Sequence, residues 1–193
     1  MSERVGLTAT RVVAAGAALA DEVGFPSLTM GMLAKRMGVR TPSLYKHVAH
    51  QEDLHRRIAV LAVNEAAVAM ESAIRGRTGR DALTSAMRAF RGYVLSHPGR
   101  YAATIGVEAL VPDDPMACAR DRFEETLRST LQSYPIGPAH TMHAMRALRS
   151  ILHGFASLQA AHGFQHATDI DESFEWLIDV ADRGLRSAPN QTC

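Results

Sequence analysis

A chain of 193 residues, with 47% apolar and 21% charged side chains, is long enough to bury a substantial core but too short for several large domains. It has no apolar run near the roughly 18 residues that a membrane helix needs, and its first residues do not resemble a secretory signal, so we expect a soluble protein without a membrane partner. Two cysteines, Cys118 and Cys193, make no disulfide framework and favour a cytoplasmic location.

The charge is distributed unevenly along the chain. The net charge of +1 would by itself argue against a nucleic-acid partner. However, residues 1–60 contain eight basic and five acidic side chains, a net +3, which leaves −2 for the remainder. The modest positive excess therefore lies in the N-terminal third, where it would attract an anion such as DNA. The neighbouring Arg56 and Arg57 are expected to form an ordinary solvated surface pair.

Helix-forming residues dominate throughout, and no stretch alternates between apolar and polar side chains, which predicts an all-α protein. The first helix is expected to begin after Thr8, its N-cap, and to run to Val23 before Gly24 ends it.

Two short helices follow. Thr29 is expected to cap the first of them, which ends at Gly38, and Thr41 to cap the second, with Pro42 at its first position. Two short helices separated by a glycine turn are typical of a helix-turn-helix.

The second of these short helices has one apolar and one polar side. Leu44 and Val48 are four residues apart, which places both on the buried face. The remaining side chains face outward and suit an anionic partner near a helix N-terminus: Thr41, Ser43, Tyr45, Lys46 and His47.

Six longer helices are predicted after this motif, separated by glycine and proline breaks. Glu52 and Asp53 suit the first turn of the earliest of them. The expected ranges are 51–75, 81–96, 98–110, 116–133, 139–162 and 171–186.

The stretch from Leu28 to Leu54, LTMGMLAKRMGVRTPSLYKHVAHQEDL, resembles the DNA-binding motif of the TetR family of bacterial transcriptional regulators. Residue types agree without a gap through the Leu-Thr start, the Leu-Ala and Gly-Val pairs and the Pro-x-Leu-Tyr-x-His-Val run. The resemblance implies that the helix beginning near Thr41 enters the DNA major groove.

The resemblance also implies which side chains contact DNA. Two positions depart from the family pattern. Some relatives have a base-reading arginine at the position of Gly31, and many have a phosphate-binding lysine at that of Gln51. Fewer phosphate contacts predict a shallower salt dependence, for which Arg40 would compensate. The implied contacts, with Thr29 on phosphate, are Thr29, Thr41, Pro42, Ser43, Tyr45, Lys46 and His47.

The segment RALRSILHGFASLQAAHGF, followed by DIDESFEWLIDVADRGL, resembles a regulatory domain of one branch of the same family. Relatives often have a Trp one turn before the His-Gly pair, where this chain has Arg149. The resemblance implies that residues 1–50 bind DNA and that residues 51–193 bind an effector and form a dimer.

The last two predicted helices have apolar faces that are unsuited to contact with water. We expect them to pair with a second copy of the chain as a four-helix bundle across a two-fold axis. The residues assigned to this face are Ile151, Phe155, Leu158, Leu177 and Val180.

The Met and aromatic side chains of the C-terminal part, Trp176 included, are expected mainly in the core, and some of them around a pocket for an apolar effector. His153 faces the predicted interior, either as a hydrogen-bonded core histidine or as a polar contact to the effector. The helix over 98–110 is expected to relay the effector signal. The assigned pocket residues are Phe90, Tyr93, Tyr101, Met142 and His153.

Other classes of function have weaker support. The pairs His140/His143 and His162/His166 have helical chelate spacing, but no cysteine completes a ligand set, so we expect no metal or cofactor. The sequence lacks G-x-S-x-G and glycine-rich phosphate loops, which disfavours an enzyme. We predict a dimeric regulator that represses from a palindromic operator and is released by a small effector, with activation as the other polarity. The alternative is a small-molecule binding or catalytic helical protein whose helix-turn-helix is structural.

Overall fold

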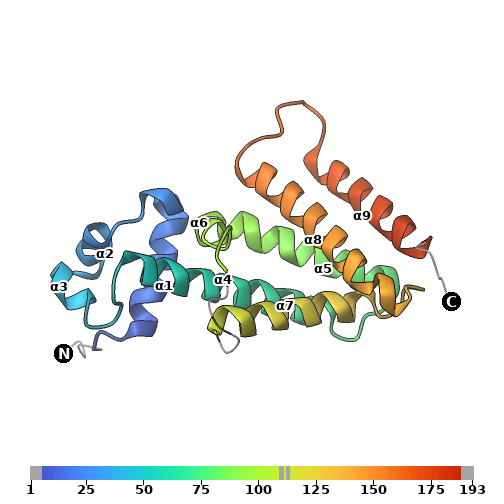
Figure 1. Ribbon diagram of the computed structural model, residues 1–193. Coiled ribbons are helices and arrows are strands. Elements are labelled where there is room, and N and C mark those ends of the chain that lie inside the picture. The colour runs from blue at the N-terminus through green and yellow to red at the C-terminus, as the bar shows by residue number, and fades with distance from the viewer. Residues whose placement is uncertain (1–5, 109–110, 112–113, 188–193) are drawn as a thin grey trace. The chain divides into compact units, whose positions relative to one another are not determined.

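The computed structural model describes residues 6–108, 111 and 114–187. Within these residues it contains nine α-helices, one 3-10 helix and no strand, which confirms the all-α prediction (Figure 1). The chain divides into two compact units, residues 1–63 with 97–117 and residues 64–96 with 118–193. Residues 97–117 therefore belong with the N-terminal helices. The functional division into 1–50 and 51–193 stays a prediction.

The first unit begins with the capped helices that the sequence predicts. Thr8 and Thr29 each accept a hydrogen bond from the backbone N–H three residues on, at 3.2 and 3.3 Å. Gly24 and Gly38, both with positive φ, end the two helices. The elements of this unit are α1 (Ala9–Val23), η1 (Phe25–Ser27), α2 (Met30–Met37), α3 (Thr41–Leu44), the first half of α4 (Gln51–Ile74) and α6 (Pro98–Ala102).

Helix α1 approaches α4 closely because of a glycine. A Cβ atom added at Gly16 would lie 3.2 Å from the Cδ1 atoms of both Leu54 and Ile58. Those two side chains are fully buried, as are Val12 and Ala17 of α1. The missing side chain thus lets two leucine-sized groups fill the space beside α1.

Helix α6 packs against the C-terminal half of α1. A Cβ atom added at Gly99 would lie only 1.9 Å from the backbone oxygen of Ala20, so only glycine fits at this position. The contact is reinforced by Asp21, whose carboxylate accepts hydrogen bonds from the backbone N–H and the Nε–H of Arg100, each at 2.8 Å.

Helix α6 is shorter than the sequence predicts. It ends at Ala102 instead of continuing to residue 110, which lies outside the described residues. The Thr104 hydroxyl donates to the backbone oxygen of Tyr101 at 2.8 Å, and Gly106 adopts a φ of 76°. A left-handed residue four positions after the helix end redirects the chain, although residues 103–110 are apolar enough to look helical.

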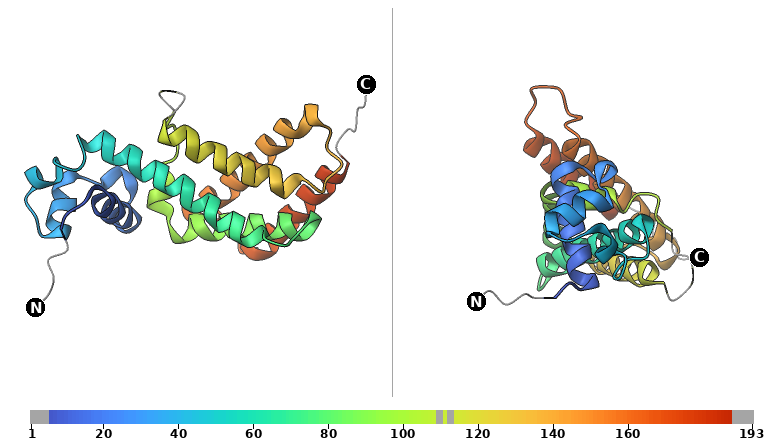
Figure 2. Two further views of the ribbon diagram at one scale, coloured as in Figure 1. Left: turned by 90° about the horizontal axis from the view of Figure 1, so that it is seen from below. Right: turned by 90° about the vertical axis from the view of Figure 1, so that its left-hand side faces the viewer.

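The second unit is a bundle of longer helices whose bounds agree with the predicted ranges within two residues. The C-terminal half of α4, α5 and α7 run alongside one another, and a loop joins α8 to α9 (Figures 1 and 2). None of the described helices is long and apolar enough to span a bilayer. The elements are the rest of α4, α5 (Gly79–Ser96), α7 (Pro115–Leu131), α8 (Pro138–Ala160) and α9 (Ile170–Arg186).

A Gly99→Ala substitution tests the contact between α6 and α1. Because the added methyl group collides with the α1 backbone, we expect the free energy of unfolding to fall by about 1–3 kcal/mol, measured by urea denaturation. Gly31→Ala in α2 is the matched control, since its Cβ would meet nothing within 4 Å. That control should be neutral or slightly stabilising. Equal stability of both variants would contradict the contact.

Candidate DNA-binding surface and the exposed face of α8 and α9

The turn between α2 and α3 is closed by Gly38. Its N–H bonds to the backbone oxygen of Lys35 at 3.2 Å, and the next N–H, of Val39, bonds to that of Ala34 at 3.0 Å. The second short helix begins one residue earlier than predicted. Arg40, in extended conformation, is the N-cap and accepts the first helical bond from Ser43 at 2.9 Å. Thr41 is therefore the first helical residue and not the cap.

The side chains around α3 divide into buried and exposed groups as predicted. Leu44 is 0% exposed and Val48 is 1% exposed, so these two anchor the helix. Tyr45, in contrast, is 48% exposed. The other residues assigned to DNA contact lie at the surface of this unit, four of them exposed (Thr29, Arg40, Pro42, Lys46) and three half-buried (Thr41, Ser43, His47).

The junction between α3 and α4 is fixed by reciprocal capping. Asp53 accepts a hydrogen bond from the Ala49 N–H at 2.8 Å and donates its own N–H to His50 Nδ1 at 3.1 Å. Its other carboxylate oxygen accepts from Arg57 at 2.8 Å. Burial raises the pKa of Asp53, but the bonds from Arg57 and Ala49 outweigh it, so the net pKa lies below its ordinary value. This anionic cap ties the loop that follows α3 to the first turn of α4.

Most arginines of the first unit are committed to ion pairs within the chain. Arg36 forms a bidentate pair with Glu22, and the hydrogen bond lowers the pKa of that carboxyl. Arg57 and Arg100 are likewise paired, with Asp53 and Asp21. Among the described residues, three exposed cations of this unit form no ion pair: Lys35, Arg40 and Lys46. The cationic charge left for an external anion is thus near α3.

Arg56 is not the solvated surface residue that the sequence suggests. Its guanidinium is paired with Asp114 and donates to the backbone oxygen of Glu108 at 2.8 Å. Asp114, only 5% exposed, also accepts from the Met116 N–H at 2.8 Å and so caps α7. Arg56 therefore connects α4 to the start of α7. The partner lies 58 residues away along the chain, which no local pattern reveals.

The residues assigned to an effector pocket have different environments. Phe90 and Tyr93 are buried in the second unit, where the Tyr93 hydroxyl donates to Glu65 at 2.9 Å. Met142, in contrast, is 40% exposed, so a pocket in the interior would not include it. His153 is half-buried, with Nδ1 3.5 Å from the Ser157 hydroxyl, and Tyr101 belongs to the first unit. The pocket as a whole stays a prediction.

An apolar face of α8 and α9 remains at the surface. Leu158 is 52% exposed and Val180 is 36% exposed, while Ile151, Phe155 and Leu177 are half-buried. Some residues assigned to the dimer face also contact buried side chains of their own unit.

The Phe155 ring contacts the Phe174 ring at a tilt of 53°, with ring centroids 5.0 Å apart, and the Arg91 guanidinium lies 4.6 Å from the centre of the Phe174 ring. Trp176, expected in the interior, is instead 65% exposed. It is directed away from the buried Phe174, two residues earlier on α9.

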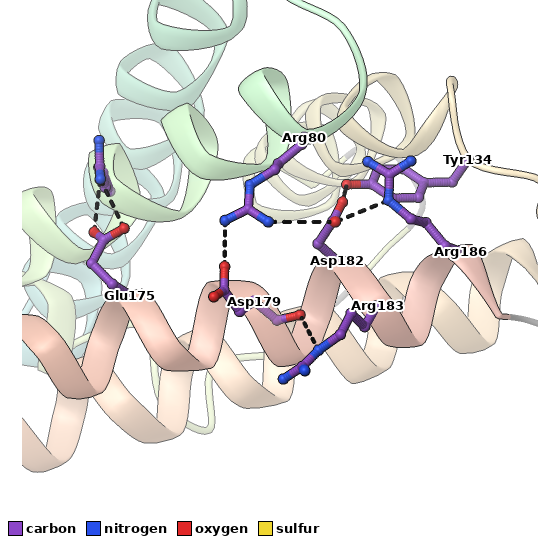
Figure 3. Close-up of polar contacts among 8 residues, drawn as sticks. Arg80, Tyr134, Glu175, Asp179, Asp182, Arg183 and Arg186 are labelled. Carbon is purple, nitrogen blue, oxygen red and sulfur yellow. Dashed lines mark hydrogen bonds and ion pairs between the residues drawn. The ribbon is translucent and has the colours of Figure 1, made fainter.

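A buried carboxylate fixes the orientation of α9 (Figure 3). Asp182, 4% exposed, accepts hydrogen bonds from the Tyr134 hydroxyl at 2.6 Å and from Arg186 Nε at 2.9 Å. Arg80 approaches the same carboxylate at 3.7 Å and pairs with Asp179. The bond from Arg186 lowers the pKa of Asp182, burial opposes this, and the Tyr134 bond adds to the lowering. This network leaves the opposite side of α9 for the exposed apolar face.

The two histidine pairs that have chelate spacing in the sequence lie on different segments of the second unit. His140 and His143 lie on α8 with ring centroids 6.5 Å apart, whereas His162 and His166 are exposed residues of the loop between α8 and α9. In the part of the chain that the structure describes, no three His, Cys, Asp or Glu side chains form a group that could hold a metal ion.

Comparisons with known proteins agree on one family. Residues 83–181 match the model of the tetracyclin repressor-like C-terminal domain. An uncharacterized HTH-type transcriptional regulator of Bacillus subtilis (strain 168) is 32% identical over 96% of this chain and 96% of its own length. Another, of Mycobacterium tuberculosis (strain ATCC 25618 / H37Rv), is 32% identical over 82% of this chain and 72% of its own.

Solved structures have the same fold. A TetR variant from Acinetobacter baumannii AYE, crystallised in complex with minocycline, is 26% identical with a TM-score of 0.70 and covers 95% of this chain and 100% of its own. A protein of unknown function from Rhodococcus sp. RHA1 has a TM-score of 0.79 at 20% identity, covering 97% of this chain and 100% of its own.

Asp182→Asn tests the network that orients α9. Near neutral pH we expect it to lower the free energy of unfolding by about 1–3 kcal/mol, because Arg186 loses its buried counter-charge. The pKa of Asp182 is lowered in the folded state. Its contribution to the free energy of unfolding is therefore complete above roughly pH 4, the pKa region of an unfolded aspartate, and is lost as the pH falls through the lower folded-state pKa. The two proteins should therefore converge in stability in acid, measured by urea denaturation at several pH values.

Asp179→Asn is the matched control, because its side chain is 46% exposed and its loss should cost less than about 1 kcal/mol. An Asp182→Asn variant as stable as wild type at pH 7 would refute the assigned role.

Proposed function

This chain belongs to the TetR family of transcriptional regulators, and we propose that it represses transcription as a dimer bound to a palindromic operator, from which a small apolar effector releases it. The observation that carries the proposal is the division of side chains around α3. Leu44 and Val48 are buried as anchors, while Tyr45 and Lys46 are exposed in the turn directly after the C-terminal end of the helix. A helix anchored in this way can present hydroxyl, amide and cationic donors to the edges and phosphates of a DNA groove.

Charge supports this assignment of the surface. The arginines of the first unit are largely neutralised by carboxylates of the same unit, whereas Lys35, Arg40 and Lys46 are exposed and form no ion pair among the described residues. Three cations near one helix provide a phosphate-binding surface without a high overall charge. Because so few cations are involved, the salt dependence of binding should be shallow for a protein of this type.

The exposed apolar face of α8 and α9 supports the proposed dimer. Leu158 and Val180 lie in water in the single chain, and a partner copy that covered them would gain from their burial. A four-helix bundle across a two-fold axis would bury roughly 1,200 Å² or more. Two α3 helices about 34 Å apart would then meet successive major grooves on one side of the duplex, which requires a palindromic site.

The effector is proposed to bind in the second unit, with Phe90, Tyr93 and His153 as the polar and aromatic contacts. These side chains are buried or half-buried there, and Tyr93 already carries a hydrogen bond to Glu65. The complex of the Acinetobacter baumannii TetR variant with minocycline supports a small-molecule ligand. An effector that shifts the protein away from DNA must bind the released form more tightly, by roughly 2–4 kcal/mol.

Replacing Tyr45 or Lys46 by Ala tests the DNA contact. We expect each variant to bind the operator more weakly by about 1–3 kcal/mol at unchanged thermal stability, because both side chains are exposed and support no core contact. Lys46→Ala should also reduce the slope of log affinity against log salt by about 0.9. The operator is selected from random duplexes by the full chain, and affinity is measured by fluorescence anisotropy.

Arg128→Ala, on the surface of α7, is the matched control because it removes one exposed positive charge from the second unit. It should bind the operator nearly as wild type does. If the Tyr45 and Lys46 variants also bind as wild type, α3 is not the recognition helix.

Leu158→Glu tests the dimer. The wild type should sediment as a dimer at micromolar concentration, and the variant as a folded monomer, because the seam would have to bury an unpaired charge. Val68→Glu is the control, since Val68 is a 43% exposed residue of α4 outside the α8 and α9 face. The control should remain dimeric. A wild-type monomer at this concentration would exclude the proposed dimer.

A further inference from the structure

The single tryptophan of the chain is exposed to solvent. Trp176 is 65% exposed, although indole is among the side chains that gain most from burial. Phe174 and Ile178, two residues before and after it on α9, are fully buried, so the helix directs Trp176 away from the core of its own unit. Val180, one turn further on, is also exposed, and the two form a short apolar stripe.

A charge-free groove lies on the same pair of helices. It has a volume of about 480 Å³ and is lined by α8 between His140 and Ile151 and by α9 between Val180 and Ser187. No Asp, Glu, Lys or Arg side chain lines it, and Trp176 is not among its lining residues. Small residues, Ala147 and Gly184 among them, leave the groove open. A volume of this size accepts a large apolar side chain.

We propose that this groove receives the Trp176 side chain of a second copy of the chain, so that two symmetric indole insertions specify the dimer. The inference rests on the dimer proposed above. In a two-fold interface, a residue that contacts a site on its partner is matched by the reverse contact. An axis that crosses α9 near Val180 places the N-terminal part of one α9 opposite the C-terminal part of the other. Trp176 then lies opposite the residues of α9 that line the groove.

The charges on α9 are consistent with this orientation. Three acidic residues of α9 are bound within the chain, Glu175 to Arg88, Asp179 to Arg80, and Asp182 to Arg186 (Figure 3). These three carboxylates therefore need no new partner when a second copy approaches Trp176 and Val180, whereas Glu172, one turn before Trp176, is exposed and has to stay at the rim of the contact. Shape also favours an aromatic occupant, because buried aromatic anchors in pockets dominate the energetics of many interfaces.

The tryptophan itself reports on its burial, because each chain contains one. Full-length protein is studied at concentrations where sedimentation establishes a dimer, and its indole fluorescence is quenched with acrylamide against N-acetyltryptophanamide as the exposed reference. We expect a blue-shifted emission and quenching at least about threefold weaker than the reference. Trp176→Ala should raise the dimer dissociation constant by roughly thirtyfold or more.

Gly184→Leu tests the groove independently of the indole. A Cβ atom at Gly184 meets nothing within 4 Å in the single chain, so the leucine should fill the groove without disturbing the fold. We expect this variant to lose dimerisation or to show a fully quenchable Trp176. Gly92→Leu on α5 is the matched control, because its Cβ also meets nothing within 4 Å, and it should behave as wild type.

The outcomes separate the two proposals. A sedimenting dimer whose Trp176 is as quenchable as the reference would overturn the insertion while leaving the proposed dimer standing. A Gly184→Leu dimer with the emission and quenching of wild type would likewise overturn the groove as the receiving site. A wild-type chain that remains monomeric would overturn the dimer itself and the insertion with it.

Discussion

Two close contacts of helix α1, each made possible by a glycine, determine how the helices of the first unit pack. At Gly16, the missing side chain leaves room for the Leu54 and Ile58 side chains of α4. At Gly99, it lets the backbone of α6 lie against the carbonyl of Ala20 in α1. A larger residue at Gly99 would collide with the α1 backbone, whereas one at Gly16 would require the ends of the Leu54 and Ile58 side chains to shift. The α2–α3 motif depends on α4 in turn, because the Asp53 cap joins α4 to the loop that follows α3.

The polar contacts of the two units have different roles. In the first unit, the bonds of Asp21, Asp53 and Asp114 each join two elements, so electrostatics completes a packing that the small residues allow. In the second unit, Asp182 determines which side of α9 is turned toward α5 and α7. Because Asp182 fixes one side of α9 by polar contacts, the apolar residues on the opposite side of the helix lie at the surface. The apolar surface of α8 and α9 is therefore a consequence of the interior network.

Local chemistry made the helices near the N-terminus predictable. Thr8, Thr29 and the glycines at 24 and 38 act within four residues of the backbone groups they satisfy, and a sequence pattern contains that information. The length of α6 was overestimated because residues 103–110 are apolar, whereas the left-handed Gly106 depends on tertiary context. Arg56 and Asp182 find partners 58 and 48 residues away, beyond any local spacing. Trp176 was misplaced because hydrophobicity alone does not distinguish a buried position from an exposed apolar one.

The separation of buried and exposed side chains around α3, the proposed recognition helix, has a consequence for how this protein can evolve. Leu44 and Val48 are the fully buried side chains of α3 and the turn after it, whereas the other side chains there are half-buried or exposed. If these outward residues contact DNA as proposed, substitutions among them would change the DNA sequences that are recognised while leaving folding nearly unaffected. A duplicated copy of the gene can thus acquire a new target by a few exchanges on one short helix.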